Sequence, residues 1–439
     1  MATLQVPLIG AVTAPIRSRA DRRPPRRSRR QLVGAATALL LGIAGPLLAP
    51  VGAQATPVGP GISIRPAAAP VGHGTGNSCS LARSTITATA GVDTVRTDRF
   101  TAFGNAGGGA DGDGWSGADS TYSAPISGGR LAWIFSDTFL GPVAADGSRP
   151  TSSPFLNNSI VIEKNGTLTT VHGGTATDPT ALVPPDDPDS WYWFGDGIAD
   201  RSGRQLDVVA LKFAKFGPGI WDWSWSSNSL VRFDTRTWQR SAILPLPSSA
   251  GIQWSSWIQR QGRDLLVYGV EDLGAQKYLH LAKVIGGDLA ATSTWRYWDG
   301  SHWSATETDS ARILDHVANE MSVTPFRDGY LAVTQDTTVP FDATIRGYVA
   351  CNPQGPFTDI GTLYSMPETG PAGSYGDPNV FAYNAHEHPE LRRGNSIYLT
   401  YNVNTLDNPS LYRDASIYRP RFVKVDLAVT APHRSTPHR

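Results

Sequence analysis

The 439-residue sequence has no excess of either charge, because 38 Lys and Arg residues balance 38 Asp and Glu residues. Proteins that bind nucleic acid or an anionic membrane through their surface potential need a net positive field. Eight arginines cluster between Ile16 and Arg30, directly before an apolar run. An export signal has its basic segment at this place, so these arginines are assigned to the signal. The rest of the chain is therefore not expected to bind nucleic acid.

Cysteine is scarce: the sequence contains two, Cys79 and Cys351. No CxxC pair and no dense group of Cys and His is present, which argues against a zinc site. In an oxidising compartment two cysteines tend to pair. A Cys79–Cys351 disulfide is therefore expected, and two unpaired thiols without a role are the alternative.

Motifs of several enzyme classes are also missing. The sequence has no GxSxG nucleophile elbow and no GxxxxGK phosphate loop. The segment Asp111-Gly-Asp113-Gly resembles the beginning of a calcium loop but lacks the later ligands and the distal Glu. A turn is expected there, a structural calcium ion is left open, and no other cofactor is expected.

The apolar run Leu32–Leu48 is shorter than the ~20 residues of a membrane-spanning helix and contains Gly and Pro. It is followed by Ala53-Gln-Ala55, the small-x-small pattern of a cleavage site. Residues 1–55 are therefore predicted to be a removable export signal, without stable membrane insertion. The segment Ser28-Arg-Arg-Gln-Leu-Val33 resembles a twin-arginine signal, which directs folded proteins outward, and an ordinary Sec signal is the alternative. The expected location is secreted or in the cell envelope.

Residues 56–78 and 429–439 are expected to be a flexible lead-in and a flexible tail. Between them, residues 79–428 show little helical periodicity and many short apolar stretches bounded by Gly, Asn or Asp. This pattern predicts a single all-β domain. The clearest predicted strands are Arg130–Phe135, Leu206–Phe213, Leu265–Val270, Tyr330–Thr334 and Ser396–Tyr401.

Each of these strands lies in a sequence unit of similar layout. In each unit a polar or acidic group comes first, followed by a short strand, a Gly-containing turn and an apolar strand. Five such units predict a five-bladed β-propeller, and a β-sandwich with irregular loops is the alternative. Because the first strand of each propeller blade lines the central channel, the polar groups should meet in one funnel.

Carboxylates dominate the residues expected in that funnel. Like charges in proximity raise one another's pKa, so that one carboxyl stays protonated while another ionises. Glycoside hydrolysis requires such a pair, and Asp119 and Asp137, at the two ends of one hairpin, are the favoured candidates. The alternative is that each Asp binds a turn or strand backbone. The full candidate set is Asp119, Asp137, Asp196, Glu320, Glu387, His388 and Asn402.

Aromatic residues are compatible with a sugar ligand. Trp115, Trp193 and Trp254 are the candidates for substrate contact. The alternating Trp221-x-Trp223-x-Trp225 would place three rings on one face of a strand, either as a stacking platform or as packing between blades. His386 and His388 would share one side of a strand, which is compatible with a metal or with a hydrogen-bonded core.

Two segments of the chain resemble known families. Gly117-Ala-Asp119-Ser-Thr-Tyr-Ser, Leu131–Gly141 and Asn157-Asn-Ser159 resemble the opening blade of the domains of unknown function 4185 and 5005. The segments Asn384–Leu391 and Thr400–Asn404 look like the closing blade of the 5005 group. The 4185 group is now glycoside hydrolase family 183, whose members are endo-D-arabinanases.

The resemblance implies a five-bladed propeller that hydrolyses a furanoside-containing cell-wall polysaccharide, D-arabinan in particular. It also implies that Asp119 and Asp137 are the catalytic pair, although Ser136 replaces the glycine usual before the second aspartate. The protein is expected to act as a monomer on a polysaccharide. A propeller that binds carbohydrate without catalysis is the competing hypothesis.

Overall fold

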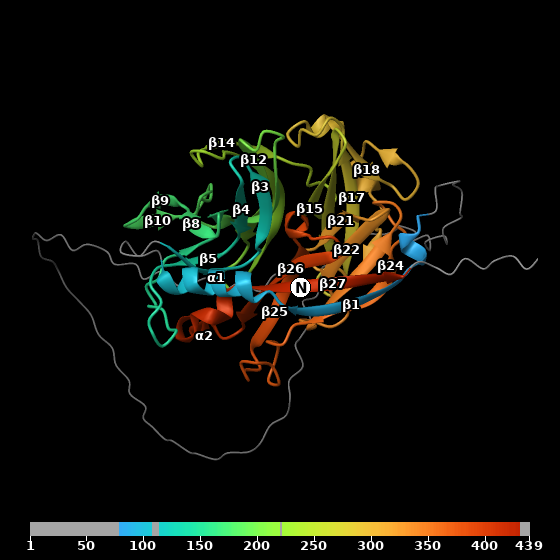
Figure 1. The fold of residues 1–439 in the computed structure, drawn as a ribbon. Coiled ribbons are helices and arrows are strands. Elements are labelled where there is room, and N and C mark those ends of the chain that lie inside the picture. The colour runs from blue at the N-terminus through green and yellow to red at the C-terminus, as the bar shows by residue number, and fades with distance from the viewer. Residues whose placement is uncertain (1–78, 108–113, 220–221, 431–439) are drawn as a thin grey trace, which may run out of the picture. The chain divides into compact units, whose positions relative to one another are not determined.

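The computed structural model describes residues 79–107, 114–219 and 222–430 (Figure 1). The predicted export signal and lead-in, the Asp111–Asp113 motif, Trp221 and residues 431–439 of the predicted tail lie outside these residues. The described residues are all-β, with mostly antiparallel sheets and two short α-helices, α1 (Thr94–Ala106) and α2 (Asn408–Arg413). Neither helix has the length and apolar character needed to cross a membrane, and no other helix in the described residues has them.

Five sheets follow one another along the chain, and their strands pair in chain order from the first strand outward, with two exceptions. In the third sheet β20 pairs with β17, and in the fifth sheet β1 forms the outer edge. The first contains β3 (Tyr122–Ile126), β4 (Arg130–Phe135), β7 (Ser159–Lys164) and β8 (Thr167–Val171). The second contains β11 (Ser190–Ala199), β12 (Gln205–Lys215), β13 (Trp223–Asp234) and β14 (Arg240–Pro245). The third contains β15 (Ile252–Gln261), β16 (Asp264–Asp272), β17 (Lys277–Val284), β18 (Trp295–Trp298), β19 (Trp303–Ser304) and β20 (Leu314–Asp315).

The last two sheets have four strands each. The fourth contains β21 (Ser322–Phe326), β22 (Gly329–Gln335), β23 (Thr344–Ala350) and β24 (Thr358–Ser365). The fifth contains β25 (Val380–Glu387), β26 (Ser396–Thr405), β27 (Pro420–Thr430) and β1 (Thr85–Val92). Smaller sheets are formed by β2 (Trp115–Ala118), β5 (Thr138–Leu140) and β6 (Phe155–Leu156), and by β9 (Gly173–Thr175) and β10 (Asp178–Thr180).

All five strands singled out from the sequence are confirmed, and each is the second strand of a different sheet. A second strand has a neighbour on either side and packs on both faces, so its residues are almost continuously apolar. Leu265–Val270 of β16, for example, is buried along its whole length. The five separate sheets are not the two facing sheets of a sandwich.

The fifth sheet joins the two ends of the described chain. β1 pairs antiparallel with β27 over its whole length, from Thr85 opposite Thr430 to Val92 opposite Val423. The predicted disulfide is confirmed: Cys79, just before β1, is bonded to Cys351, just after β23. The start of the domain is therefore held to its late part by both a strand and a covalent bond.

Helix α1 was not predicted from the sequence. Its apolar residues are few, but Asp93 caps it by accepting a hydrogen bond from the Arg96 N–H. Its last turn is followed by Gly107 with φ of 55°, a left-handed conformation that suits glycine. The helix buries Phe100 against Trp115 and so belongs to the core.

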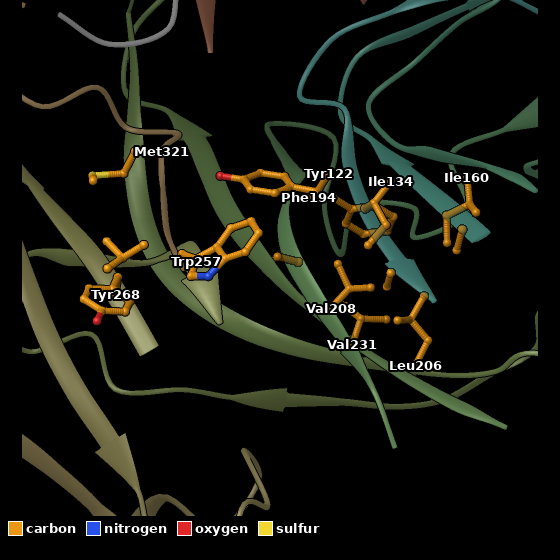
Figure 2. Close-up of a cluster of buried hydrophobic side chains, with 14 of the residues drawn as sticks. Tyr122, Ile134, Ile160, Phe194, Leu206, Val208, Val231, Trp257, Tyr268 and Met321 are labelled. Carbon is orange, nitrogen blue, oxygen red and sulfur yellow. The ribbon is translucent and has the colours of Figure 1, made fainter. Parts of the chain in front are cut away.

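The first strands of the five sheets are neighbours in succession. β3 contacts β11, β11 contacts β15, β15 contacts β21, and β21 contacts β25. The Tyr122 ring of β3 stacks on the His386 ring of β25, with 4.3 Å between centroids. Figure 2 shows buried side chains from this region, with Tyr122 and Phe194 lying near Trp257. The packing of successive first strands on one another therefore brings the polar residues at their ends together.

Candidate active site

Three of the five first strands are interrupted where they carry polar residues. The antiparallel register shifts between Phe194 and Gly197 in β11, between Gln253 and Trp257 in β15, and between Tyr383 and His386 in β25. A bulge leaves residues unpaired and re-aims their side chains. Side chains at these breaks therefore do not follow the strict alternation of a regular strand.

A small pocket, with a cavity volume of about 30 Å³, lies at this level of the first strands. All five sheets contribute to it, either from a first strand or from the residues beside it. Among the residues predicted from the sequence, Asp119, Glu320 and Trp193 are on its wall. The lining residues are Asp119, Ser136, Trp193, Phe194, Gly195, Leu211, Phe213, Gln253, Ser255, Asn319, Glu320 and Asn384. This set is called the carboxylate pocket below.

Asp119 is a buried carboxylate held by two tyrosines. Its side chain is 1% exposed, and its Oδ2 accepts hydrogen bonds from the Tyr383 hydroxyl at 2.6 Å and the Tyr418 hydroxyl at 2.8 Å. Burial raises the pKa of Asp119 to about 6, and the tyrosine hydrogen bonds limit that rise. Asp119 is therefore ionised at neutral pH.

Asp137 lies beside Asp119 because β2 and β5 pair, with Ala118 opposite Thr138. The Asp119 N–H donates to the Asp137 carbonyl at 3.2 Å. The Asp137 side chain is not on the pocket wall. Its Oδ1 accepts a hydrogen bond at 2.9 Å from Nε1 of Trp193, and the Trp193 side chain does line the pocket. Burial and then the charge of Asp119 raise the pKa of Asp137 well above its ordinary value. The charge of Asp119 therefore favours the protonated form of its neighbour Asp137.

Glu320 supplies a third carboxyl. Its Oε1 accepts a hydrogen bond from the Ser120 hydroxyl at 2.9 Å, and burial followed by the charge of Asp119 raises its pKa well above the ordinary value. Glu320 Oε2 and Asn384 Nδ2 are buried and have no hydrogen-bond partner among the described residues. Buried polar atoms are rarely left unpaired, so these two atoms on the pocket wall are suited to bind a ligand.

Three residues with a left-handed backbone lie at or beside the same pocket. Ser120, Thr121 and Asn384 have φ values of 76°, 67° and 61°. For a β-branched residue such as Thr121 this left-handed conformation is unfavourable, and each such residue costs about 1–3 kcal/mol. Strain of this kind persists where surrounding contacts enforce it and is frequent at functional sites.

An aromatic cluster on the second sheet forms one side of the pocket. Trp193 and Phe213, whose ring centroids are 4.3 Å apart, line the pocket. Trp191, Trp223 and Trp225 pack against them in a cluster separate from the main core. Trp223 and Trp225 of the predicted alternating row therefore pack with neighbouring aromatics, while Trp193 is the ring that reaches both the pocket and Asp137.

Two predicted tryptophans belong to the core instead. Trp115 is completely buried and packs on Phe100, with 5.6 Å between ring centroids. Trp254 is also buried, and its Nε1 donates to Glu307 Oε1 at 2.8 Å. Neither ring is on the wall of the carboxylate pocket, because both side chains point into the packing within or between sheets.

Asp196 and Glu387 serve the framework. Asp196 accepts hydrogen bonds from the backbone N–H groups of Ile258 at 2.6 Å and of Gly197 at 2.8 Å. Asp196 thereby connects the bulge of β11 to β15. This is the backbone-binding role that was expected from the sequence as the alternative to catalysis. Glu387 is enclosed by Arg392, which donates to both of its carboxylate oxygens, and by Thr324. Neither carboxyl reaches the carboxylate pocket.

The histidines and Asn402 also lie behind the pocket wall. His388 contacts the hydroxyls of Ser123 at 2.5 Å and Thr400 at 2.8 Å. Both ring nitrogens of His386 lie 3.1 Å from backbone carbonyls. Asn402 donates to the hydroxyl of the strained Thr121 at 2.9 Å and so supports that turn. In the described part of the chain, no group of three or more His, Cys, Asp or Glu side chains could hold a metal ion.

Most of the lining residues were missed from the sequence, and so were the two tyrosines that hold Asp119. Tyr383 and Asn384 lie just before the polar group that begins the fifth sequence unit. They could have been added to the candidate site residues on that ground. Tyr418 lies in a short 3-10 helix, η6 (Ala415–Tyr418), and is 299 residues away from the aspartate that it contacts. No local pattern indicates that contact.

Fold and site define this chain as an all-β protein in which five antiparallel sheets enclose a buried group of carboxyls beside an aromatic wall. The chain belongs to the family described as "Domain of unknown function (DUF5005)", whose model matches residues 109–427. No curated protein sequence matches it.

One solved structure shares the fold at low sequence identity, and two others are similar at lower TM-scores. A crystal structure from Bacteroides ovatus ATCC 8483, provisionally described as a hydrolase, is 18% identical, with a TM-score of 0.63 over 78% of this chain and 94% of that chain. An inulosucrase from Halalkalicoccus jeotgali bound to kestose is 15% identical, with a TM-score of 0.43 over 75% and 90%. Zg3597, a family 117 glycoside hydrolase from Zobellia galactanivorans, is 11% identical, with a TM-score of 0.39 over 81% and 96%.

Proposed function

We propose that this protein is a glycoside hydrolase in which Asp119 and Asp137 are the catalytic pair. The observation that carries the proposal is that two buried aspartates lie side by side at the pocket, joined by the hydrogen bond from the Asp119 N–H to the Asp137 carbonyl at 3.2 Å. Burial raises the pKa of both carboxyls, and the charge of Asp119 raises that of Asp137 further. Adjacent carboxyls with separated pKa values are the requirement of glycosidic bond hydrolysis. The fold shared with the Bacteroides ovatus protein, provisionally described as a hydrolase, supports the same reaction class.

We assign Asp137 as the proton donor to the leaving glycosidic oxygen. Its carboxyl lies behind Trp193 in this structure and would have to be uncovered when the substrate binds. The ionised Asp119 is suited to act on the sugar ring, either by activating a water molecule or by attacking the anomeric carbon. The Tyr383 and Tyr418 hydroxyls hold the Asp119 carboxylate in one orientation. Glu320 is on the pocket wall, and its Oε2, which accepts no hydrogen bond among the described residues and lies 4.0 Å from His386 Nδ1, would bind a substrate hydroxyl.

The five sheets are interpreted as the blades of a five-bladed propeller, with the carboxylate pocket in its central funnel. The proposed substrate is a furanoside-containing cell-wall polysaccharide, D-arabinan in particular. Its support is the resemblance of the segments around Asp119 and Asp137 to the domain of unknown function 4185 and glycoside hydrolase family 183. The protein would meet this polymer after export by the segment at residues 1–55, and the Cys79–Cys351 disulfide supports an oxidising compartment.

Hydrolysis of a polysaccharide panel tests the proposal. The purified protein is incubated with D-arabinan, arabinogalactan and plant arabinan, and the products are resolved by size. D-arabinan should be shortened by the wild type, and Asp119→Asn and Asp137→Asn should each lower the rate by at least about a hundred-fold. Asp146→Asn, at an exposed loop position, is the matched control and should keep full activity. Unchanged hydrolysis by Asp137→Asn would contradict the proposed pair.

A carbohydrate-binding protein without catalysis is the second candidate. It is favoured by the aromatic cluster of Trp193 and its neighbours, which could hold a sugar without any reaction. This candidate predicts that the polysaccharide binds, that no product forms, and that Asp137→Asn binds as tightly as the wild type. Release of shortened chains by the wild type would exclude it.

A further inference from the structure

A second and larger pocket adjoins the carboxylate pocket. Its volume is about 380 Å³, and it shares Asn319 and Asn384 with the carboxylate pocket. It is called the side pocket here. The lining residues are Gly274, Ala275, Lys277, Ala318, Asn319, Gln335, Asp336, Thr337, Thr338, Val339, Pro340, Phe341, Phe381, Tyr383 and Asn384.

A row of aromatic rings connects the side pocket to the candidate catalytic residues. The centroids of Phe341 and Phe381 are 4.2 Å apart, and those of Phe381 and Tyr383 are 5.3 Å apart. The Tyr383 hydroxyl donates to Asp119. A molecule lying along this row would therefore extend from the side pocket to the ionised carboxylate.

The charged and polar groups of the side pocket already have partners in the protein. Lys277 forms an ion pair with Asp272 at 3.1 Å and also donates to Asn319. Asp336 accepts hydrogen bonds from both the backbone N–H and the hydroxyl of Thr338. The side pocket is therefore not built to attract a charged ligand, since its lysine and its aspartate are both engaged.

One buried donor is an exception. Asn384 is 5% exposed, and its Nδ2 has no hydrogen-bond partner among the residues described. Its backbone is held in a left-handed conformation, with φ of 61°, at the boundary between the two pockets. A ligand that satisfies this donor must present an oxygen acceptor at that boundary.

The segment that carries Phe341 is held in a specific conformation. Phe341 has φ of 56°, an uncommon value for an aromatic residue. Gln335, at the start of the segment, donates to the carbonyl groups of Asp342 and Ala382. These contacts fix the Phe341 ring beside Phe381, so the aromatic surface is formed before a ligand binds.

We propose that the side pocket binds a neutral sugar residue of the substrate chain, adjacent to the residue at the carboxylates. This inference rests on the proposed hydrolase function. A sugar ring has an apolar face that packs on aromatic rings and has oxygens that accept hydrogen bonds. Phe341 and Phe381 provide the aromatic surface, and Asn384 provides the donor toward the carboxylate pocket.

The test uses D-arabinan oligosaccharides of increasing length and three variants. Phe341→Ala removes the ring, Phe341→Tyr retains it, and Phe216→Ala is the matched control, because Phe216 is 71% exposed and lines neither pocket. Phe341→Ala should raise KM about ten-fold for oligosaccharides long enough to enter the side pocket. It should leave kcat and the KM of the shortest cleaved oligosaccharide unchanged. Phe341→Tyr and Phe216→Ala should behave as the wild type.

The outcomes separate this inference from the proposed function. If Phe341→Ala affects long and short oligosaccharides equally, or affects neither, the side pocket is not a sugar site, although the hydrolase proposal stands. If the wild type cleaves no oligosaccharide, the hydrolase proposal fails, and binding becomes the readout. Retardation of the protein in a gel that contains D-arabinan should then be weaker for Phe341→Ala than for the wild type. Equal retardation, including none for either protein, would overturn the inference.

Discussion

Asp119→Asn should make the protein more stable at neutral pH while it abolishes hydrolysis. Burial raises the pKa of Asp119 from 3.8 to about 6, so the folded protein binds this proton more tightly than the unfolded chain does. The contribution of Asp119 to stability is therefore greatest below pH 3.8 and is lost as the pH rises through about 6. At about 1.4 kcal/mol per pH unit, the loss amounts to about 3 kcal/mol.

The Asp119→Asn substitution removes the stability loss that accompanies ionisation of Asp119, and it changes little else in the site. A side-chain amide has nearly the size of a carboxyl and retains an oxygen that can accept the Tyr383 and Tyr418 hydroxyls. The free energy of unfolding of Asp119→Asn should therefore match the wild type near pH 4. It should exceed the wild-type value by about 3 kcal/mol near pH 8.

Urea unfolding of both proteins at these two pH values is the assay. The reasoning is refuted if Asp119→Asn is no more stable than the wild type at the higher pH, or if the difference is the same at both pH values. Asp146→Asn is the control. The Ser148 hydroxyl and N–H lower the pKa of the exposed Asp146, so its replacement should bring no gain at the higher pH.

Three further perturbations have defined outcomes. Tyr418→Phe removes a hydroxyl that lowers the pKa of Asp119, so the acidic limb of the pH–rate profile should move upward from about 6 by about one pH unit; an unmoved limb would argue against Asp119 as the ionised group. Replacing Cys79 and Cys351 by Ser removes a cross-link between residues 272 apart. It should lower the free energy of unfolding in urea by about 2–5 kcal/mol, and a reductant should then have no further effect on this variant. Gly117→Ala places a Cβ 2.2 Å from the Tyr418 carbonyl oxygen. Calorimetry should show a loss of at least about 1–3 kcal/mol, and an unchanged melting temperature would contradict this packing.

The strands could be predicted from the sequence because their signal is local. The second strand of each sheet is an apolar segment such as Leu265–Val270, bounded by turn residues, and burial on both faces gives it that composition. The disulfide was also predictable, since Cys79 and Cys351 are the two cysteines in the chain. β1 gave a weaker signal, because Thr and Ala alternate in it and its partner β27 lies at the far end of the domain.

The sequence by itself also determined that Asp119 and Asp137 lie together, because one precedes and the other follows the two strands of a single hairpin. Only the tertiary structure decided which of the other polar residues join them. Register breaks in the first strands and left-handed residues such as Asn384 set the direction of each side chain, and long-range contacts enforce them. These contacts bring Glu320 and Tyr418 to Asp119 and leave other candidates in the framework. The physical reason is that strand propensity arises from near neighbours, whereas the orientation of a buried polar group depends on partners hundreds of residues away.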